Sequence, residues 1–322
     1  MTDEINFTRL GQANMTGDTM ALFKEQFIPE LLTEFDAKRV MKNYVRSKKI
    51  MKGKSATFPV LGSTSAKYVT VGDSLLGNQS IAHNEITINV DPFLVSDILI
   101  HELDVKLQEY DDRSEIVTEM ARALANTEDK QLLQVGILAA RAGSTITGRP
   151  GGTVMRAGAD VKTDAAVLAA AIYASGVELD EKNVEEFDRY CFVRPLQYAM
   201  LAQYEDIKNH DIGTGSYTDG TTGKLNNIQV IKTNHLPQTN ITQSADTTQP
   251  NNIYYGDFTN TAALVMNRNA IGTVSREGLI VEPKWILERL AHLLTARILQ
   301  GHGILRPECA VEISAQSAQS GS

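Results

Sequence analysis

Apolar and polar side chains alternate with a period of two between residues 55 and 92. Ile86, Ile88 and Val90 alternate with polar residues, which predicts a half-buried strand, and an earlier strand is expected at 67–71. Glycines punctuate the stretch between them. The simplest arrangement is one long hairpin with a wide tip. Because an isolated hairpin is marginally stable in water, we expect either the rest of the chain or another subunit to cover it.

A helical period begins near residue 112. Asp112 and Glu115 form a capping-box-like start, apolar residues then recur at intervals of three and four, and Gly143 ends the pattern, which weakens at 126–130. Unbroken, such a helix would be roughly 40 Å long at ~1.5 Å per residue. Two further helices are expected, one at 164–175 that Gly176 stops and one that Pro195 opens.

The remaining pattern predicts strands joined by unusually long polar loops. The continuous apolar run at 93–100 indicates a buried strand, and the apolar spacing at 285–299 fits a helix. Loops of the length seen at 205–225 and 237–252 are uncommon in compact domains and indicate surfaces that partners complete. Further strands are expected at 189–193, 228–231, 262–266, 270–274 and 303–313.

The front of the chain combines an aromatic segment with a basic one. Residues 20–35 include Phe23, Phe27 and Phe35, an apolar load that should dock either on its own domain or on a neighbour. Residues 38–54 contain no acidic residue. Such a run fits a solvated face, or a contact with an acidic partner or nucleic acid. The candidates for that contact are Lys48, Lys49 and Lys52.

Composition narrows the class of protein. The chain has 322 residues and a net charge of -8, opposite in sign to that of a global DNA binder. Its two cysteines, Cys191 and Cys309, are expected to be buried free thiols and form neither a disulfide framework nor a zinc site. No signal peptide and no membrane-spanning run is recognisable.

Sequence motifs for catalysis are incomplete. The triplet Gly53, Lys54, Ser55 ends like a phosphate-binding loop, but position 48 is lysine where that motif needs glycine. His101 and Glu102 begin like a zinc-protease helix, but the partner position is Val105. We therefore assign no catalytic, metal-binding or cofactor-binding residue and expect no cofactor. A soluble α/β enzyme stays as an alternative class.

Four short strings, in order across almost the whole chain, resemble the major capsid protein of T-seven-like podoviruses. They lie at 53–62, 110–115, 268–274 and 301–308. Each string is short, but their shared order and spacing make the resemblance specific. The residues that we single out from them are Tyr110, Asp111, Arg113, Glu115, Gly301, His302, Gly303, Arg306, Pro307 and Glu308.

The resemblance implies an α+β fold, the tailed-phage major capsid fold of the Hong Kong phage type. Its parts would be an N-terminal arm, an extended loop called the E-loop, a peripheral domain with a long spine helix, and an axial domain. In such folds the segment at 276–304 forms long strands, which conflicts with the helical reading of 285–299. The expected boundaries are 1–54 for the arm, 55–92 for the E-loop, 93–162 and 276–304 for the peripheral domain, 163–275 for the axial domain, and 305–322 for a final axial strand and flexible tail.

The resemblance also implies a structural role in the virion. The chain would form hexamers and pentamers of an icosahedral head that encloses double-stranded DNA, assembled in the cytoplasm of a host bacterium. Further partners would be a portal protein, a decoration protein and the packaged DNA, bound mostly without sequence specificity, and no membrane. An encapsulin-type shell protein is the alternative within the same fold. The expected interface residues, from the arm and E-loop, are Phe23, Phe27, Phe35, Phe58, Pro59, Tyr68, Ile86 and Ile88.

A separate scaffolding protein is the last expectation. Only about 54 residues precede the E-loop, which is too few for a fused domain of usual size. A subunit that joins its copies through weak contacts needs something to select the curvature of the shell. We therefore expect the scaffolding protein to act in trans.

Overall fold

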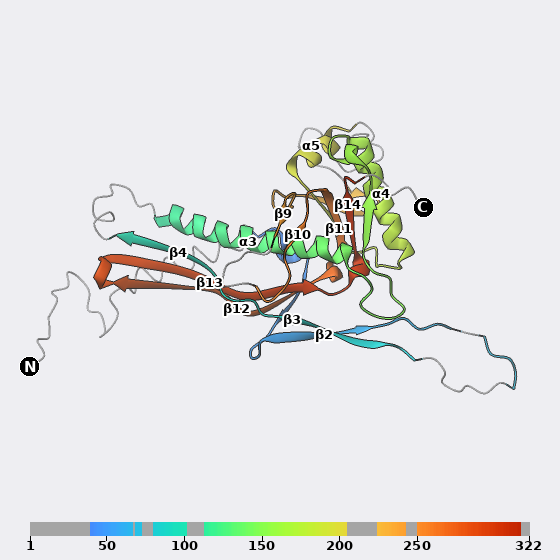
Figure 1. The fold of residues 1–322 in the computed structure, drawn as a ribbon, viewed down its shortest axis with the longest axis horizontal. Coiled ribbons are helices and arrows are strands. Elements are labelled where there is room, and N and C mark those ends of the chain that lie inside the picture. The colour runs from blue at the N-terminus through green and yellow to red at the C-terminus, as the bar shows by residue number, and fades with distance from the viewer. Residues whose placement is uncertain are drawn as a thin grey trace, which may run out of the picture.

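The chain folds into an elongated molecule in which one long helix runs along two sheets and a hairpin projects away from both (Figure 1). The computed structural model describes residues 39–66, 68–72, 80–101, 113–204, 224–242 and 250–316. The first sheet is long and narrow and lies under the helix. The second is six-stranded, lies at the helix's C-terminal end, and carries the two shorter helices (Figure 1).

The long sheet has the strand order β1-β12-β13-β4. Its centre is an antiparallel hairpin of β12 and β13, closed by the short helix η4, with Leu290 in the left-handed conformation after it. β4 pairs antiparallel with β13, and β1 pairs parallel with β12. The elements are β1 (Arg46–Lys49), β4 (Leu94–His101), β12 (Ile271–Ile286), η4 (Leu287–Arg289) and β13 (Ala291–Ile304).

Helix α3 (Arg113–Arg141) confirms the predicted spine, with 29 residues. Its first half packs Met120 and Leu124 against Leu294 and Ile298 of the long sheet, and its second half enters the main core beside the six-stranded sheet. One helix therefore belongs to both cores, which ties the two sheets together.

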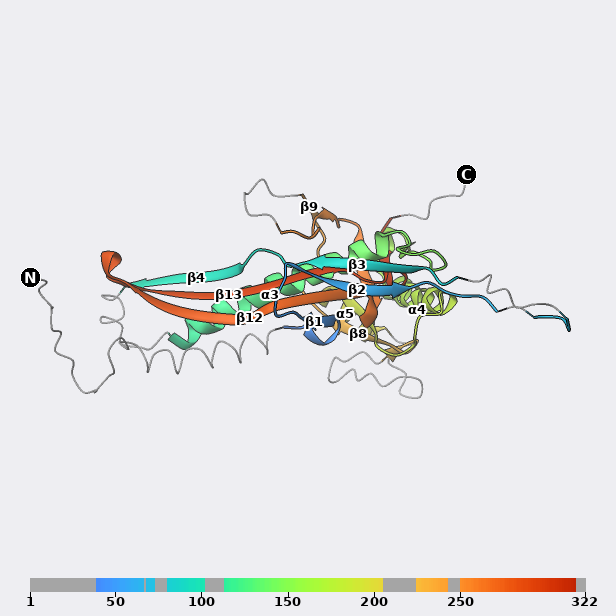
Figure 2. The same cartoon turned by 90° about the horizontal axis from the view of Figure 1, so that it is seen from below.

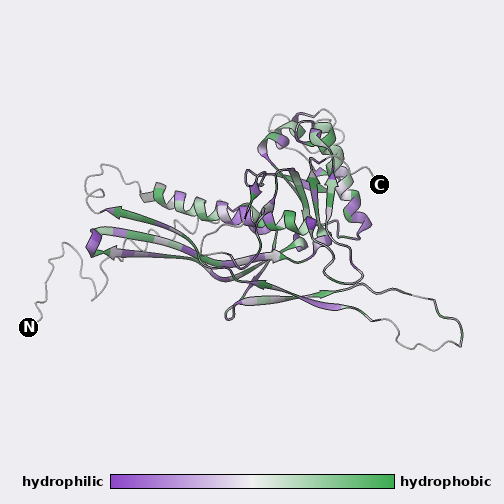
Figure 3. Cartoon of the chain, in the orientation of Figure 1, coloured by the Kyte–Doolittle hydropathy of each residue, from purple (hydrophilic) through white to green (hydrophobic). Residues whose placement is uncertain are grey.

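The polar interruption at 126–130 has a structural cause. Figure 3 shows hydrophilic residues in the middle of α3, yet Glu128 and Asp129 are buried there. Asp129 accepts hydrogen bonds from the backbone N–H groups of Val40 (2.9 Å) and Met41 (3.0 Å), and Glu128 pairs with Arg39. Burial raises the pKa of both carboxyls. The apolar pattern of α3 thus weakens at the point where the helix binds the segment at residues 39–41.

The six-stranded sheet has the order β5-β14-β11-β6-β8-β7. Its central strand β11 is buried at every position, as expected for a strand covered on both faces. The sheet comprises β5 (Thr153–Arg156), β6 (Arg189–Val193), β7 (Lys224–Leu225), β8 (Ile228–Lys232), β11 (Thr261–Asn267) and β14 (Ala310–Ser314); around it lie α4 (Ala165–Glu181), α5 (Pro195–Gln203), the pair β9 (Asn240–Ile241) and β10 (Gly256–Asp257), and the short helices η1 (Met41–Asn43), η2 (Ala159–Lys162), η3 (Arg268–Ala270) and η5 (Pro307–Cys309).

The projecting hairpin consists of β2 (Ser55–Leu61) and β3 (His83–Asn89), paired from Ser55 with Asn89 to Leu61 with His83. Seen from below, it extends past the end of the six-stranded sheet (Figure 2). The predicted hairpin is confirmed, but its first strand is not where we expected it. The described residues 68–70 are not in a strand, and 55–61 provides the partner instead.

The conflict over 285–299, which the sequence left open between helix and strand, is resolved in favour of strands. Residues 291–304 form β13, in which Leu294, Ala296 and Ile298 face α3 while the residues between them are half-buried. Because both faces of this strand carry apolar residues, its spacing fits a helical period as well as a strand. Pairing with β4 and β12 on either side decides between them.

Three other predictions needed correction, one on burial and two on where an element ends. The strand at 94–101 alternates between half-buried and exposed positions rather than lying in the interior, because α3 covers only one of its faces. Helix α4 continues through Gly176 to Glu181, and this glycine is a packing position, since a Cβ there would overlap the Asn226 amide. The strand expected at 303–313 is divided by η5, which Pro307 opens.

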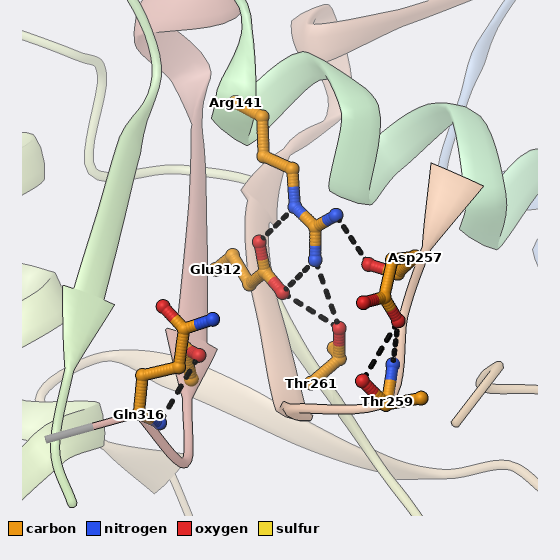
Figure 4. Close-up of polar contacts among 7 residues, drawn as sticks. Arg141, Asp257, Thr259, Thr261, Glu312 and Gln316 are labelled. Atoms are coloured by element: carbon orange, nitrogen blue, oxygen red, sulfur yellow. Dashed lines mark hydrogen bonds and ion pairs between the residues drawn. The ribbon is translucent and has the colours of Figure 1, made fainter. Parts of the chain in front are cut away.

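A buried ion pair joins the end of α3 to the six-stranded sheet (Figure 4). Arg141 places Nε and Nη2 each 2.6 Å from the two carboxylate oxygens of Glu312, whose side chain is 0% exposed. Arg141 also donates to the Asp257 carbonyl (2.5 Å), and the Thr261 hydroxyl donates to Glu312 (2.6 Å). Such two-pronged pairs are among the strongest polar contacts in proteins.

We expect Glu312→Leu to lower the free energy of unfolding by about 1–3 kcal/mol, because the Arg141 guanidinium, whose side chain is 30% exposed, loses its buried partner. Glu119→Gln, which removes an exposed i,i+3 pair with Arg122 on the same helix, should cost less than about 1 kcal/mol. Urea denaturation followed by circular dichroism measures both. Similar losses for the two variants would contradict a special role for this joint.

Candidate assembly interface

The projecting hairpin is rooted where β3 crosses the β12–β13 hairpin at three glycines. Gly272 and Gly303 are register partners. A Cβ on Gly303 would lie 2.8 Å from Ile88 Cγ1, one on Gly272 would lie 2.9 Å from Ile88 Cδ1, and one on Gly301 would overlap the Asn89 carbonyl. The glycines singled out at 301 and 303 therefore allow the two layers to approach closely.

Phe58 and Ile88 lie inside the chain rather than on its surface. We expected both to contact a neighbouring subunit. Instead they form a small core with Ala56, Val90, Val274 and Leu305, and Ile88 is almost completely buried. The reason is the pleat of the hairpin: one face of β2 and β3 packs on the long sheet, so these side chains hold the stem and Pro59 points outward.

A polar network fixes the chain where it leaves β3. The Tyr254 hydroxyl donates to Asp91 and accepts the backbone N–H of His302 (3.0 Å). Asp91 also accepts the backbone N–H of Asn252 (3.0 Å), and Nδ1 of His302 lies 3.0 Å from the Thr273 hydroxyl. Burial lowers the pKa of His302 to about 3, so its ring is neutral at physiological pH and acts as a packing and hydrogen-bonding group.

The loop after α3 supports the other side of the stem. Arg149 donates from Nε to the Leu61 carbonyl (2.8 Å), Asn84 donates to the Thr145 carbonyl (2.7 Å), and the Ser63 hydroxyl donates to the Gly148 carbonyl (2.7 Å). These bonds lie at the end of the β2–β3 ladder, where the two strands separate. They set the direction in which the hairpin leaves the body.

Three residues from the last resembling string hold that support in place. The buried carboxylate of Glu308 lies 2.8 Å from Arg306 Nε and 3.5 Å from Arg149 Nη1. Pro307 starts η5, which carries Glu308 into the interior. Glu308 thus acts on the hairpin stem through Arg149, which donates to the Leu61 carbonyl.

Beyond the stem the hairpin presents apolar side chains to solvent. Tyr68 and Val71 are fully exposed, and Leu61, Val69 and Ile81 are each exposed by more than two-fifths. Ile86, on β3, is half-buried. A projecting segment with this many uncovered apolar residues is typical of a surface that another chain covers.

A second apolar surface lies on the long sheet, on the face opposite α3. Val95 and Leu99 of β4, with Phe93 just before it, are each exposed by more than two-fifths. Arg297 lies over the Phe93 ring at 5.4 Å and pairs with Glu282 at 2.9 Å. Among the described strands, β4 is also an edge strand of this sheet, and such an edge is a common site for pairing with another chain.

The basic run forms an exposed edge of the same sheet. All four residues of β1 are exposed. Lys48 donates to the Thr57 carbonyl (3.0 Å) and lies 5.3 Å from the centre of the Phe58 ring, so it braces the hairpin stem. Lys49 and Lys52 are exposed.

Several predicted residues lie outside the described part of the chain. These are Phe23, Phe27 and Phe35 of the arm, and Tyr110 and Asp111 of the second string. Of that string, Arg113 opens α3 and Glu115 lies in its first turn.

The described residues contain no group of three or more histidine, cysteine and acidic side chains that could hold a metal ion. Cys191 and Cys309 are free and buried, as predicted, and burial raises the pKa of both thiols to about 12. No helix in this part of the chain is long and apolar enough to cross a membrane.

Sequence patterns did not reveal the polar residues that orient the hairpin. Arg149, Asp91 and Tyr254 come from segments that we interpreted only as loops or turns. Their contacts join residues more than 85 positions apart. The one signal near any of them is the group of glycines at 143–160 around Arg149, which indicates only a loop or short hairpin.

Comparison with known proteins identifies this architecture. The model of the family described as "Gp10A-like: Major capsid protein" matches residues 57–314. The major capsid protein of Escherichia phage T7 is 29% identical over 320 residues, covering 91% of this chain and 92% of that protein.

Comparison with solved structures gives the same assignment as the sequence matches. The capsid structure of the cyanophage P-SCSP1u superposes with a TM-score of 0.78 at 33% identity, covering 87% of this chain and 89% of that one. The mature capsid of bacteriophage PhiM1 has the same fold, with a TM-score of 0.71 at 16% identity and 86% coverage of both chains. These matches confirm the expected tailed-phage capsid fold and favour neither the encapsulin-type shell protein nor the soluble enzyme.

The projecting apolar hairpin, the spine helix shared by two sheets and the family match across most of the chain lead to one conclusion: this chain belongs to the Gp10A-like major capsid protein family and is a structural component of a phage virion.

Proposed function

We propose that this protein builds the hexamers and pentamers of an icosahedral head around double-stranded DNA, and that the β2–β3 hairpin is the E-loop that lies over a neighbouring subunit. The observation that carries the proposal is the uncovered apolar surface beyond the stem, from Leu61 to Ile81. Heterologous contacts that close by rotation produce rings, and many modest contacts then add through multivalency.

In this proposal the parts of the chain take the roles expected from the resemblance. The long sheet with α3 forms the peripheral domain, expected at 93–162 and 276–304. Within these expected ranges, however, β5 (Thr153–Arg156) belongs to the six-stranded sheet, and the long strand β12 already begins at Ile271. The six-stranded sheet with α4 and α5 forms the axial domain (163–275 with 305–316). The arm (1–54) and its three phenylalanines lock neighbouring subunits. Pro59, Tyr68 and Ile86 contribute to the E-loop contact.

The remaining partners follow from the role of a container. A separate scaffolding protein selects the curvature, a portal occupies one vertex, and a decoration protein binds the assembled shell, all in the cytoplasm of the host bacterium. A net charge of -8 suits a shell that holds DNA without trapping it. The protein acts by assembly alone and catalyses no reaction.

Replacing residues 64–81 by a short Gly/Ser linker should abolish closed particles while leaving the fold intact. The cut spares the β2–β3 ladder and the bonds of Asn84 and Arg149 that orient it, so the far-ultraviolet circular dichroism should change little. Negative-stain microscopy and particle yield measure assembly. A variant that still forms closed shells at the normal yield would refute the E-loop assignment.

A milder variant tests the same apolar surface without shortening the loop. Tyr68→Ser and Val71→Ser together remove two fully exposed apolar side chains without altering the length of the loop. Because each loses apolar area that a neighbour would cover, particle yield should fall without a change in thermal stability.

The exposed lysines should contact packaged DNA. Lys49→Gln with Lys52→Gln should flatten the slope of log affinity against log salt by roughly one for each lysine that contacts a phosphate. Fluorescence anisotropy of purified capsomers with a DNA duplex measures this slope. Lys284→Gln, at an exposed position elsewhere on the long sheet, should leave it unchanged. Equal slopes for both variants would assign the basic run to a solvated face.

The need for a scaffold predicts the products of assembly. The capsid protein expressed alone should yield sheets, free capsomers or shells of mixed size, whereas co-expression with its scaffolding protein should yield uniform closed particles. Electron microscopy of the two preparations decides between them. Uniform shells from the chain alone would remove the case for a scaffold in trans.

A further inference from the structure

A cavity of about 240 Å³ opens at the root of the E-loop and is lined by three arginines. They come from distant parts of the chain: Arg46 from β1, Arg149 from the loop after α3, and Arg306 from the turn before η5. Between them the walls include the apolar side chains of Phe58 and Leu305.

The three cations outnumber the acids beside them. Glu308 is buried and lies against Arg306 (2.8 Å) and Arg149 (3.5 Å). No acidic residue is among the described residues that line the cavity. Arg46 is exposed and the other two side chains are each about 30% exposed. The cavity therefore combines a positive charge excess with a fixed orientation of two of its guanidinium groups.

We propose that this cavity is a binding site for a carboxylate, supplied by an aspartate or glutamate side chain from a second copy of the chain. The proposal rests on the proposed function, because it requires subunits to meet. Guanidinium groups present paired N–H donors that match the two oxygens of a carboxylate. The chain has 39 acidic and 31 basic residues, so an excess of carboxylates is present on each copy.

A protein side chain fits the cavity better than DNA does. A single acidic side chain projecting from a loop can enter a concave site with apolar walls. A phosphate of duplex DNA belongs to a wide, rigid rod, which reaches exposed lysines such as Lys49 more readily. The apolar walls also strengthen the ion pair, because they lower the local dielectric constant.

Binding there would connect assembly to the direction of the E-loop. Arg149 donates to the Leu61 carbonyl and shares Glu308 with Arg306. A carboxylate bound among the arginines would therefore restrain the group that sets the exit angle of the hairpin. One subunit's acid would stabilise the E-loop orientation of the next.

Charge reversal at the exposed arginine tests the site. Arg46→Glu should reduce the yield of DNA-free shells at least about tenfold, the effect expected from losing one charge-assisted hydrogen-bonded contact per subunit, with unchanged circular dichroism and thermal stability. Lys284→Glu is the matched control, because it makes a basic-to-acidic change at an exposed position of the same sheet that does not line the cavity. It should assemble normally.

Cross-linking identifies the occupant. In shells of Arg46→Lys, a water-soluble carbodiimide should join the new amine to a carboxylate as an amide, with the oxygen leaving in the urea by-product. Shells that mix isotope-labelled and unlabelled chains, analysed by mass spectrometry, distinguish links between copies from links within one. We expect a link between copies in shells and none in dissociated subunits.

Several outcomes would overturn the site. One is equal assembly of Arg46→Glu and Lys284→Glu, and another is a link found only within one chain. Normal empty shells combined with weaker DNA binding in Arg46→Glu would assign the cavity to phosphate instead. Failure of the unmodified chain to assemble under any condition would count against the proposed function, whereas normal assembly of Arg46→Glu would count against this site alone.

Discussion

The close crossing of β3 over the β12–β13 hairpin is the constraint on which the rest of the structure depends. Gly272, Gly301 and Gly303 remove side chains from the crossing point, so Ile88 and the Asn89 carbonyl approach the long sheet closely. Without that approach the stem of the E-loop would stand off the body, and the small core around Phe58 would open to water. Backbone packing thus holds the hairpin stem against the body, and the hydrogen bonds of Arg149, Asn84 and Ser63 set the direction in which the hairpin leaves it.

Polar joints between distant segments then make the arrangement rigid. Asp129 holds the incoming chain against the middle of α3, and Arg141 and Glu312 hold its end against the six-stranded sheet. Asp91 with Tyr254, and Arg149 with Glu308, hold the two sides of the E-loop stem. Each of these buried charges or carboxyls has a partner that offsets part of its desolvation cost, so the joints contribute mainly to the specificity of the fold.

The surfaces that these joints leave uncovered explain why the chain acts as a subunit. Apolar side chains remain exposed along the E-loop and on the outer face of the long sheet, including Tyr68, Val71 and Leu99. A monomer gains nothing from presenting them to water. In the proposed contact a neighbouring subunit would remove them from solvent, and this burial of apolar area would favour assembly.

The sequence by itself determined the elements whose pattern is local and unambiguous. The spine helix has a capping-box-like start and a helical period over most of its length, the hairpin strand at 83–89 alternates cleanly, and the four resembling strings identified the family and hence the fold. Only the tertiary structure decided the rest. Residues 291–304 carry apolar side chains on both faces, so only pairing with β4 and β12 makes them a strand. Phe58 and Ile88 are interior because of a crossing between remote segments, and Arg149 matters because Leu61 and Glu308 arrive beside it. Contacts between residues so far apart leave no periodic signal along the chain.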